Sequence, residues 1–330
     1  MCPLQLTLLG SPVISIDGVP FNSRVDKAVA LVALLALQGP TLHRDTLIAH
    51  LWTGSETNKS RTAFRTIIWR LKSTPLSPWL EIERESVTLN TDSSIWIDTK
   101  EFREKLEKTR EHSHSPDIAC PACFPMLNRA IELYRGDFMA GYSPRNAAGF
   151  DEWRSEYGSI LHNDYLETLE RLGKGYFQHA QYSQALQVIR RWLVIDQFNE
   201  EAHSLMMRSY ASSNQRANAI AHYRSYQRLV EKQLYIDPAE ELTALYNHLL
   251  SGNSLPVTKF EPLKQPVMIL MDVSNTPELW TRHGKAVEPI LSRFNGIIKD
   301  GLRRCGGRII KQSPENFLIY FDQGQPLMCA

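Results

Sequence analysis

The sequence predicts a mainly α-helical protein of several domains, with an α+β domain first, a helical repeat domain next and an α/β segment last. Three observations predict this order. Strand-like runs and helices fill residues 1–110, a helical pattern repeats at a 34-residue period within residues 126–250, and strand-like runs return after residue 266. With 330 residues, the chain is long enough for two or three separate cores.

The composition is that of a globular protein in water, with 43% hydrophobic and 22% charged residues. The N-terminus lacks the features of a secretory signal, and no apolar run reaches the roughly 18 residues that a membrane span needs. The five cysteines are odd in number and scattered, which indicates a reducing compartment. We therefore expect a cytoplasmic protein with no membrane partner. The Walker-type, GxGxxG and HExxH motifs are absent from the sequence, and no cofactor is expected.

Three helices lie between two hairpin patterns in the first part of the chain. Asp17-Gly18 favours a tight turn in the first hairpin because Gly accepts a positive φ, and Arg84-Glu85 forms the tip of the second. The expected strands cover residues 4–9, 13–16, 19–21, 79–83, 86–90 and 95–97. The expected helices cover about residues 24–38, 43–52 and 57–72. This order is typical of a winged helix-turn-helix. In that fold the third helix enters a DNA groove and the hairpin lies beside the DNA backbone.

The third helix combines a buried back with a cationic front. Its apolar stripe at helical period consists of Phe64, Ile67, Ile68 and Leu71. Its five basic residues are Lys59, Arg61, Arg65, Arg70 and Lys72. No acid lies between Glu56 and Glu81, whereas ordinary surface helices mix both signs. Since Arg can read guanine edges and either basic residue can neutralise phosphates, the pattern favours DNA over a merely solvated face.

Residues 4–110 resemble the OmpR-type winged helix at the head of antibiotic-regulatory-protein-type (SARP) transcriptional activators. The resemblance is carried by the initial sheet and by LIAHLW at Leu47–Trp52, SRTAFRTIIWRLK at Ser60–Lys72 and IWIDTKEF at Ile95–Phe102. In the last piece, Asp98 can cap a helix and Glu101 can reach back to it.

The resemblance implies contacts to bases or sugars from Arg61, Arg65 and Trp69, and contacts to phosphates from Lys59, Arg70 and Lys72. The alternative for Trp69 is packing against the hairpin. The full set expected at double-stranded DNA is Asn58, Lys59, Arg61, Thr62, Arg65, Trp69, Arg70, Lys72 and Arg84.

Residues 111–125 are expected to form a loop that contains His112, His114, Cys120 and Cys123. Two cysteines and two histidines have the composition of a tetrahedral zinc site. In the alternative interpretation, the histidines are solvated and the cysteines line the next helix. Because a single Cys-x-x-Cys pair is shared by many sites without metal, the sequence alone favours a metal-free loop.

Residues 126–250 are expected to be helical throughout. The positions that match at the 34-residue period are Tyr176 with Tyr210, Ala185 with Ala219, Ile189 with Tyr223, and Trp192 with Tyr226. This pattern is typical of tetratricopeptide (TPR) repeats, in which small residues let paired helices approach closely. The second copy departs from it, since Met206 and Met207 replace Leu172-Gly173. We expect the aromatic positions to pack between the repeat helices.

This layout resembles the bacterial transcriptional activator domain that follows the winged helix in the same family. The matching pieces are LYRGDFMAGY at Leu133–Tyr142, FDEWRSEY at Phe150–Tyr157 and ELTALYNHLL at Glu241–Leu250. The resemblance implies that this domain makes homodimer or RNA polymerase contacts.

Residues 251–266 contain three prolines and are expected to be a linker. Residues 267–330 resemble the first part of a class III nucleotide cyclase domain, through MDVSNTPELW at Met271–Trp280 and CGGRIIKQSPENFLIYF at Cys305–Phe321. In that family, two aspartates hold the catalytic metals. Asp272 matches the first, but Glu315 stands in place of the second, with proline and asparagine where the family has glycines. The segment is therefore expected to be partial and degenerate, without an enzymatic role and without a functional magnesium site.

The leading hypothesis is a transcriptional activator that binds promoter DNA. A nucleotide-sensing or nucleotide-cyclising signalling protein with an N-terminal regulatory region is the alternative. A third hypothesis is a repeat scaffold whose winged helix binds protein. Salt-dependent duplex binding separates the first from the third, because only phosphate contacts release counterions.

Overall fold

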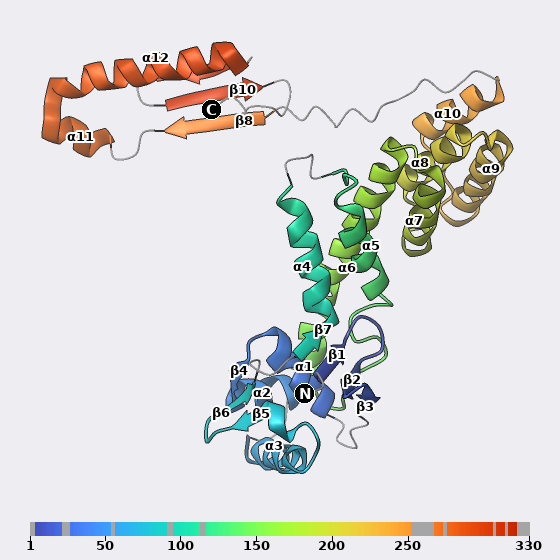
Figure 1. Cartoon of the computed structure of the whole chain (residues 1–330), viewed down its shortest axis with the longest axis vertical. Coiled ribbons are helices and arrows are strands. Elements are labelled where there is room, and N and C mark those ends of the chain that lie inside the picture. The colour runs from blue at the N-terminus through green and yellow to red at the C-terminus, as the bar shows by residue number, and fades with distance from the viewer. Residues whose placement is uncertain are drawn as a thin grey trace. The chain divides into compact units, whose positions relative to one another are not determined.

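The computed structural model describes residues 4–21, 27–53, 57–90, 95–112, 117–251, 267–272, 276–305, 308–313 and 316–321. The chain divides into two compact units, Met1–Pro256 and Val257–Ala330. Figure 1 labels their helices and strands. Helices dominate the described ranges, with small sheets beside them, which confirms the coarse fold class predicted from the sequence. Most of the expected linker lies outside these ranges.

The first sheet is formed by the two ends of the N-terminal region. Its strands are β1 (Leu4–Thr7), β2 (Val13–Ile16), β3 (Val19–Pro20) and β7 (Ile95–Ile97), in the order β3-β2-β1-β7. β7 pairs with β1 in parallel, whereas β1, β2 and β3 pair antiparallel. Asp17 and Gly18 both have positive φ, 58° and 76°, which confirms the tight turn predicted between β2 and β3.

Three helices and a second sheet follow in the predicted order. The elements are α1 (Ala28–Leu37), β4 (Thr41–His43), α2 (Arg44–Leu51), α3 (Thr57–Lys72), the short 3-10 helix η1 (Ser77–Trp79), β5 (Leu80–Ile82) and β6 (Ser86–Leu89). Nearly every side chain of α1 is buried, as its apolar run predicts. β4 is not predicted from the sequence, because three residues are too few to show alternation. It forms by pairing with β6, where Leu42 faces Val87, and gives the order β4-β6-β5.

Asp98 is the first residue of α4 (Asp98–Arg110), and its carboxylate accepts from Thr99 N at 2.8 Å. Glu101 bonds to other groups, so the predicted reciprocal capping pair is wrong. The carboxylate of Asp98 is fully buried and also accepts from the backbone N–H groups of Leu8 and Leu9, at 2.8 and 2.9 Å. Burial raises the pKa of Asp98, and these hydrogen bonds oppose that rise. Glu101 accepts instead from the indole of Trp96 at 2.7 Å and from Arg129 at 3.0 Å. Both carboxylates therefore join separate segments.

The helical region packs directly onto the N-terminal elements. After α5 (Phe124–Leu133), the chain returns to the first sheet, where Met139 N donates to Leu8 O at 2.8 Å. The next helix, α6 (Ala148–Gln178), meets the end of α2: Gly149 N donates to Thr53 Oγ1 at 2.8 Å, and the His50 ring lies 3.1 Å from Gly149 O. These contacts make residues 1–256 one compact unit.

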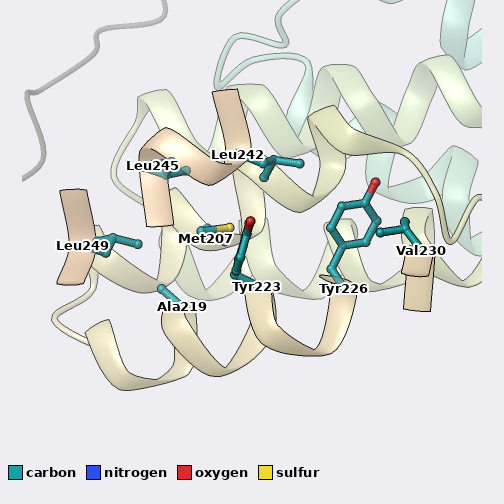
Figure 2. Packing of buried hydrophobic residues seen from close by; sticks show 8 residues of the cluster. All are labelled: Met207, Ala219, Tyr223, Tyr226, Val230, Leu242, Leu245 and Leu249. Atoms are coloured by element: carbon teal, nitrogen blue, oxygen red, sulfur yellow. The ribbon is translucent and has the colours of Figure 1, made fainter. Parts of the chain in front are cut away.

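The repeat region continues with α7 (Tyr182–Ile195), α8 (Glu200–Ser212), α9 (Arg216–Gln233) and α10 (Glu240–Leu250). Figure 2 shows the apolar cluster between α8, α9 and α10, which consists of Met207, Ala219, Tyr223, Tyr226, Val230, Leu242, Leu245 and Leu249. The earlier copy of the repeat likewise buries its matching residues in α7. The aromatic positions of the repeat therefore pack the core, as predicted.

Leucine at either repeat alanine is expected to destabilise this region. Ala185 and Ala219 are both fully buried, and added methylenes in a packed core typically cost about 1–3 kcal/mol. We expect Ala185→Leu and Ala219→Leu each to lower the urea midpoint of unfolding. Ala221→Leu is the control, because Ala221 is exposed on the same helix as Ala219. Equal midpoints for Ala219→Leu and Ala221→Leu would refute close packing at Ala219.

The described residues of the second unit form two α-helices, a short 3-10 helix and an antiparallel sheet. Its elements are β8 (Val267–Asp272), α11 (Thr276–His283), the 3-10 helix η2 (Gly284–Ala286), α12 (Val287–Cys305), β9 (Arg308–Gln312) and β10 (Asn316–Phe321). The strand order is β8-β10-β9, and the buried side chains of Phe317 and Ile319 pack with Phe294 and Ile298 of α12. Over the described residues of both units, none of the helices has the length and hydropathy required to cross a membrane.

Candidate nucleic-acid interface

The back of α3 is fixed against the rest of the N-terminal region. Phe64, Ile68 and Leu71 are buried, as their spacing predicts, whereas Ile67 is half-buried at the edge of the stripe. The ring of Phe64 packs edge-on against Trp52, which follows α2, with 6.1 Å between ring centroids. This packing sets the rotation of α3 about its axis and decides which side chains face solvent.

The front of α3 presents all of its predicted DNA-contacting residues to solvent. The exposed residues are Asn58, Lys59, Arg61, Thr62, Arg65, Trp69, Arg70 and Lys72. Trp69 is 72% exposed, which rules out the alternative that the hairpin covers it. Thr66 is also exposed, one turn beyond Thr62, and the sequence analysis missed it although the four-residue spacing could have found it.

Arg61 and Thr62 have partners within the protein. Arg61 forms an ion pair with Asp45 of α2 at 3.4 Å, with side chains that are 49% and 79% exposed. Exposed pairs of this kind contribute about 0–1 kcal/mol, so a phosphate can replace the carboxylate at little cost. The hydroxyl of Thr62 donates to Asn58 O at 2.9 Å. In this rotamer it can only accept a hydrogen bond from a ligand.

The hairpin tip is attached to the start of α2. Arg44 N donates to Glu85 O at 2.9 Å, the Arg44 side chain donates to Glu83 O, and Ser86 Oγ donates to the Glu83 carboxylate at 2.8 Å. Arg84 is exposed at the tip, as predicted. Because Glu83 and Glu85 flank it, the tip is less favourable for phosphate than the front of α3.

The remaining predicted site residues lie away from this interface. His112, Cys120 and Cys123 come together between α4 and α5, while His114 lies outside the described residues. Asp272 ends β8, where its Cα pairs with that of Asn316 at the start of β10. Glu315 lies outside the described residues, so the expectation that these two carboxylates form no functional magnesium site is not tested.

Comparisons with known proteins agree with the predicted class. Residues 97–250 match the family described as "Bacterial transcriptional activator domain". The chain is 25% identical over 227 residues to the regulatory protein AfsR of Streptomyces coelicolor, a match that covers 68% of this chain and 22% of AfsR. It is 24% identical over 256 residues to AfsR of Streptomyces griseus, covering 76% of this chain and 25% of that protein. The chain thus spans about a quarter of the curated relatives.

A solved structure shares the fold. It is Mycobacterium tuberculosis EmbR in complex with a low-affinity phosphopeptide, with a TM-score of 0.52 and 20% sequence identity. The match covers 78% of this chain and 67% of EmbR. The family match defines the class of one part of the chain: residues 97–250 are a bacterial transcriptional activator domain. More particularly, the chain is similar over 68–76% of its length to the AfsR regulatory proteins, and its fold is similar to that of EmbR.

Proposed function

We propose that residues 1–110 form a winged helix-turn-helix that binds promoter DNA, with α3 in the major groove. The observation that carries the proposal is the division of α3 into an apolar back, buried against the domain, and an exposed front with five basic residues and no acid. A helix of 16 residues is about 24 Å long, and the major groove is wide enough to admit it.

The side chains on the exposed front of α3 would contact different parts of the DNA. Arg65 and Trp69 lie opposite the buried stripe and would face bases and sugars, with Arg61 exchanging Asp45 for a DNA group. Lys59, Arg70 and Lys72 lie near the two ends of α3, where the groove walls bring phosphates close. The β5–β6 hairpin would lie beside the DNA backbone, with Arg84 facing it.

The rest of the chain would act after DNA binding. In this proposal, residues 111–123 connect α4 to α5, since the expected loop ends where α5 begins at Phe124, and residues 126–250 mediate homodimer or RNA polymerase contacts. The match to the activator domain supports this role. Residues 251–266 would be a linker, and residues 267–330 a structural or signal-receiving appendage without catalytic activity. The regulatory relatives support a non-enzymatic protein of the cytoplasm.

Substitutions on α3 should separate base reading from phosphate contacts. A binding site is first selected from random duplexes with the full chain and located by footprinting. We expect Arg65→Ala to cost about 1–3 kcal/mol on this site and to relax the preference at one base pair. Lys72→Ala should weaken binding to all duplexes alike and reduce the salt slope by about one, because it removes one phosphate contact. Fluorescence anisotropy at several salt concentrations measures both effects.

The matched control is Lys232→Ala, which removes an equal charge from an exposed position on α9. It should leave affinity and salt slope unchanged. If Arg65→Ala keeps both the affinity and the base preference of the parent chain, the assigned face of α3 is wrong. If duplex binding does not depend on salt, the protein-scaffold hypothesis replaces DNA binding.

A further inference from the structure

The geometry points to a zinc site between α4 and α5, with His112, Cys120 and Cys123 as ligands. The Sγ atoms of Cys120 and Cys123 lie 3.5 Å apart. His112 Nδ1 lies 3.5 Å from the first sulfur and 3.2 Å from the second. One nitrogen and two sulfurs therefore converge on one point, although their residues span a stretch of twelve positions in the sequence.

The three distances match the edges of a tetrahedral zinc complex. Zn–S bonds of about 2.3 Å and Zn–N bonds of about 2.0–2.1 Å place tetrahedral ligands about 3.8 Å apart for two sulfurs and about 3.6 Å apart for sulfur and nitrogen. The observed separations are shorter by no more than about 0.4 Å, so small side-chain movements would admit the ion. Two thiolates and an imidazole are soft and intermediate donors, which favour Zn²⁺ over Mg²⁺ or Ca²⁺.

The backbone places these donors by local structure at both ends of the loop. Cys123 N donates to Cys120 O at 2.9 Å, closing a turn, and Cys123 O accepts from Leu127 N in the first turn of α5. His112 lies two residues beyond the end of α4 at Arg110. Ala119 N donates to Arg171 O of α6 at 3.1 Å, so the segment before Cys120 is also held in place.

The three ligands differ in how deeply they are buried. Cys123 is fully buried, with its sulfur 3.9 Å from Thr109 O, while Cys120 and His112 are half-buried. The inner ligand is thus enclosed by protein, and the outer two leave room for water as the fourth ligand. A bound ion would cross-link the end of α4 to the start of α5 and so stabilise the connection between these helices.

A disulfide is the competing use of Cys-x-x-Cys. It requires the sulfurs to be about 2.05 Å apart, well below the observed separation, and it gives no reason for an imidazole nitrogen to contact both sulfurs. The convergence of His112 is explained by a shared metal ion. The zinc site does not depend on DNA binding by α3.

Metal analysis of the purified full chain, without a histidine tag, tests the proposal. We expect about one zinc per chain after extensive dialysis, and a lower Tm after chelation. The Cys120→Ser/Cys123→Ser variant should lose the metal, whereas Cys329→Ser, which removes a thiol outside the cluster, should keep it. Cobalt should produce the bands of a tetrahedral site with thiolate-to-metal charge transfer, and these bands should weaken in Cys120→Ser.

His112→Gln keeps both thiols and provides a second variant if the double serine variant fails to fold. It should also lose tightly bound zinc, while circular dichroism confirms that its helices remain. The proposal is overturned if the parent chain loses its zinc on dialysis, if it contains a disulfide with no metal, or if folded His112→Gln retains one zinc per chain.

Discussion

Gly175→Ala is expected to destabilise the first compact unit by about 3 kcal/mol, at the upper end of the usual cost of overpacking. A Cβ at this position of α6 would lie 2.4 Å from Ala119 O and 2.9 Å from Phe124 Cε1. The first contact is with backbone, and Ala119 is held by its hydrogen bond to Arg171 O. Relief therefore requires the 117–123 segment to move away from α6. Urea unfolding followed by circular dichroism measures the loss.

Gly173→Ala, two residues earlier in α6, is the matched control. Its Cβ would lie 3.4 Å from Ile189 Cγ1 and 3.5 Å from Leu205 Cδ2, which are side-chain atoms near ordinary contact distance. Alanine is favoured over glycine within helices by up to about 1 kcal/mol, so this variant should be neutral or stabilised. Equal destabilisation by the two substitutions would show that the approach of Ala119 is not the cause.

The contrast between these glycines shows what local sequence can predict. Gly173 belongs to the Leu-Gly pair of the TPR pattern, which predicts close packing against neighbouring helices, although Met207 takes its place in the second copy. Gly175 has no place in that pattern. Its neighbour is a loop residue 56 positions earlier, and nothing in the local sequence encodes this approach. The role of Asp98 could not be predicted for the same reason, because Leu8 and Leu9 follow β1, about 90 positions earlier in the sequence.

The candidate DNA interface was more accessible to prediction. Helical periodicity alone separates Phe64 from Arg65, and in the structure Phe64 is buried while Arg65 is exposed. The exposure of Trp69 and the ion pair of Arg61 with Asp45 required tertiary structure, because each depends on how α2 and the hairpin pack beside α3. The approach of His112 to Cys120 and Cys123 could not be predicted either, because it depends on how the end of α4 lies beside the start of α5. Composition can suggest these ligands, but only geometry can show that they share a point.

The helical repeat is expected to lose stability as the pH falls below about 6.5, because it buries a neutral histidine pair. His203 Nε2 lies 3.0 Å from Gln197 O, and since a carbonyl only accepts, this nitrogen carries the proton. His203 Nδ1 then accepts from His222 Nε2 at 2.8 Å. The His203 ring also packs on Tyr226, with 3.9 Å between centroids. With both rings neutral, all of these contacts are made.

The direction of the pH effect follows from the two pKa shifts. Burial lowers the pKa of His203, and burial together with the nearby His203 lowers the pKa of His222 to about 4. Asp196 and Glu200 favour protonation of His203 and partly oppose its shift. An unfolded histidine titrates near about 6.5, so between about pH 6.5 and 4 the unfolded chain binds more protons than the folded chain. The stability from this pair is complete above that window and decreases through it, by roughly 3 kcal/mol in total.

His222→Gln should flatten this dependence, because the amide can still donate to His203 Nδ1 but cannot take up a proton in this pH range. The measurement is the free energy of unfolding in urea at several pH values from about 7.5 to about 4.5 for the parent chain and the variant. Carboxylates also titrate near the acid end of this range, so the difference between the two slopes is the quantity to compare. His43→Gln, which replaces an exposed histidine outside the repeat, should keep the slope of the parent chain. If His222→Gln retains the full slope, the buried pair is not the source of the acid sensitivity.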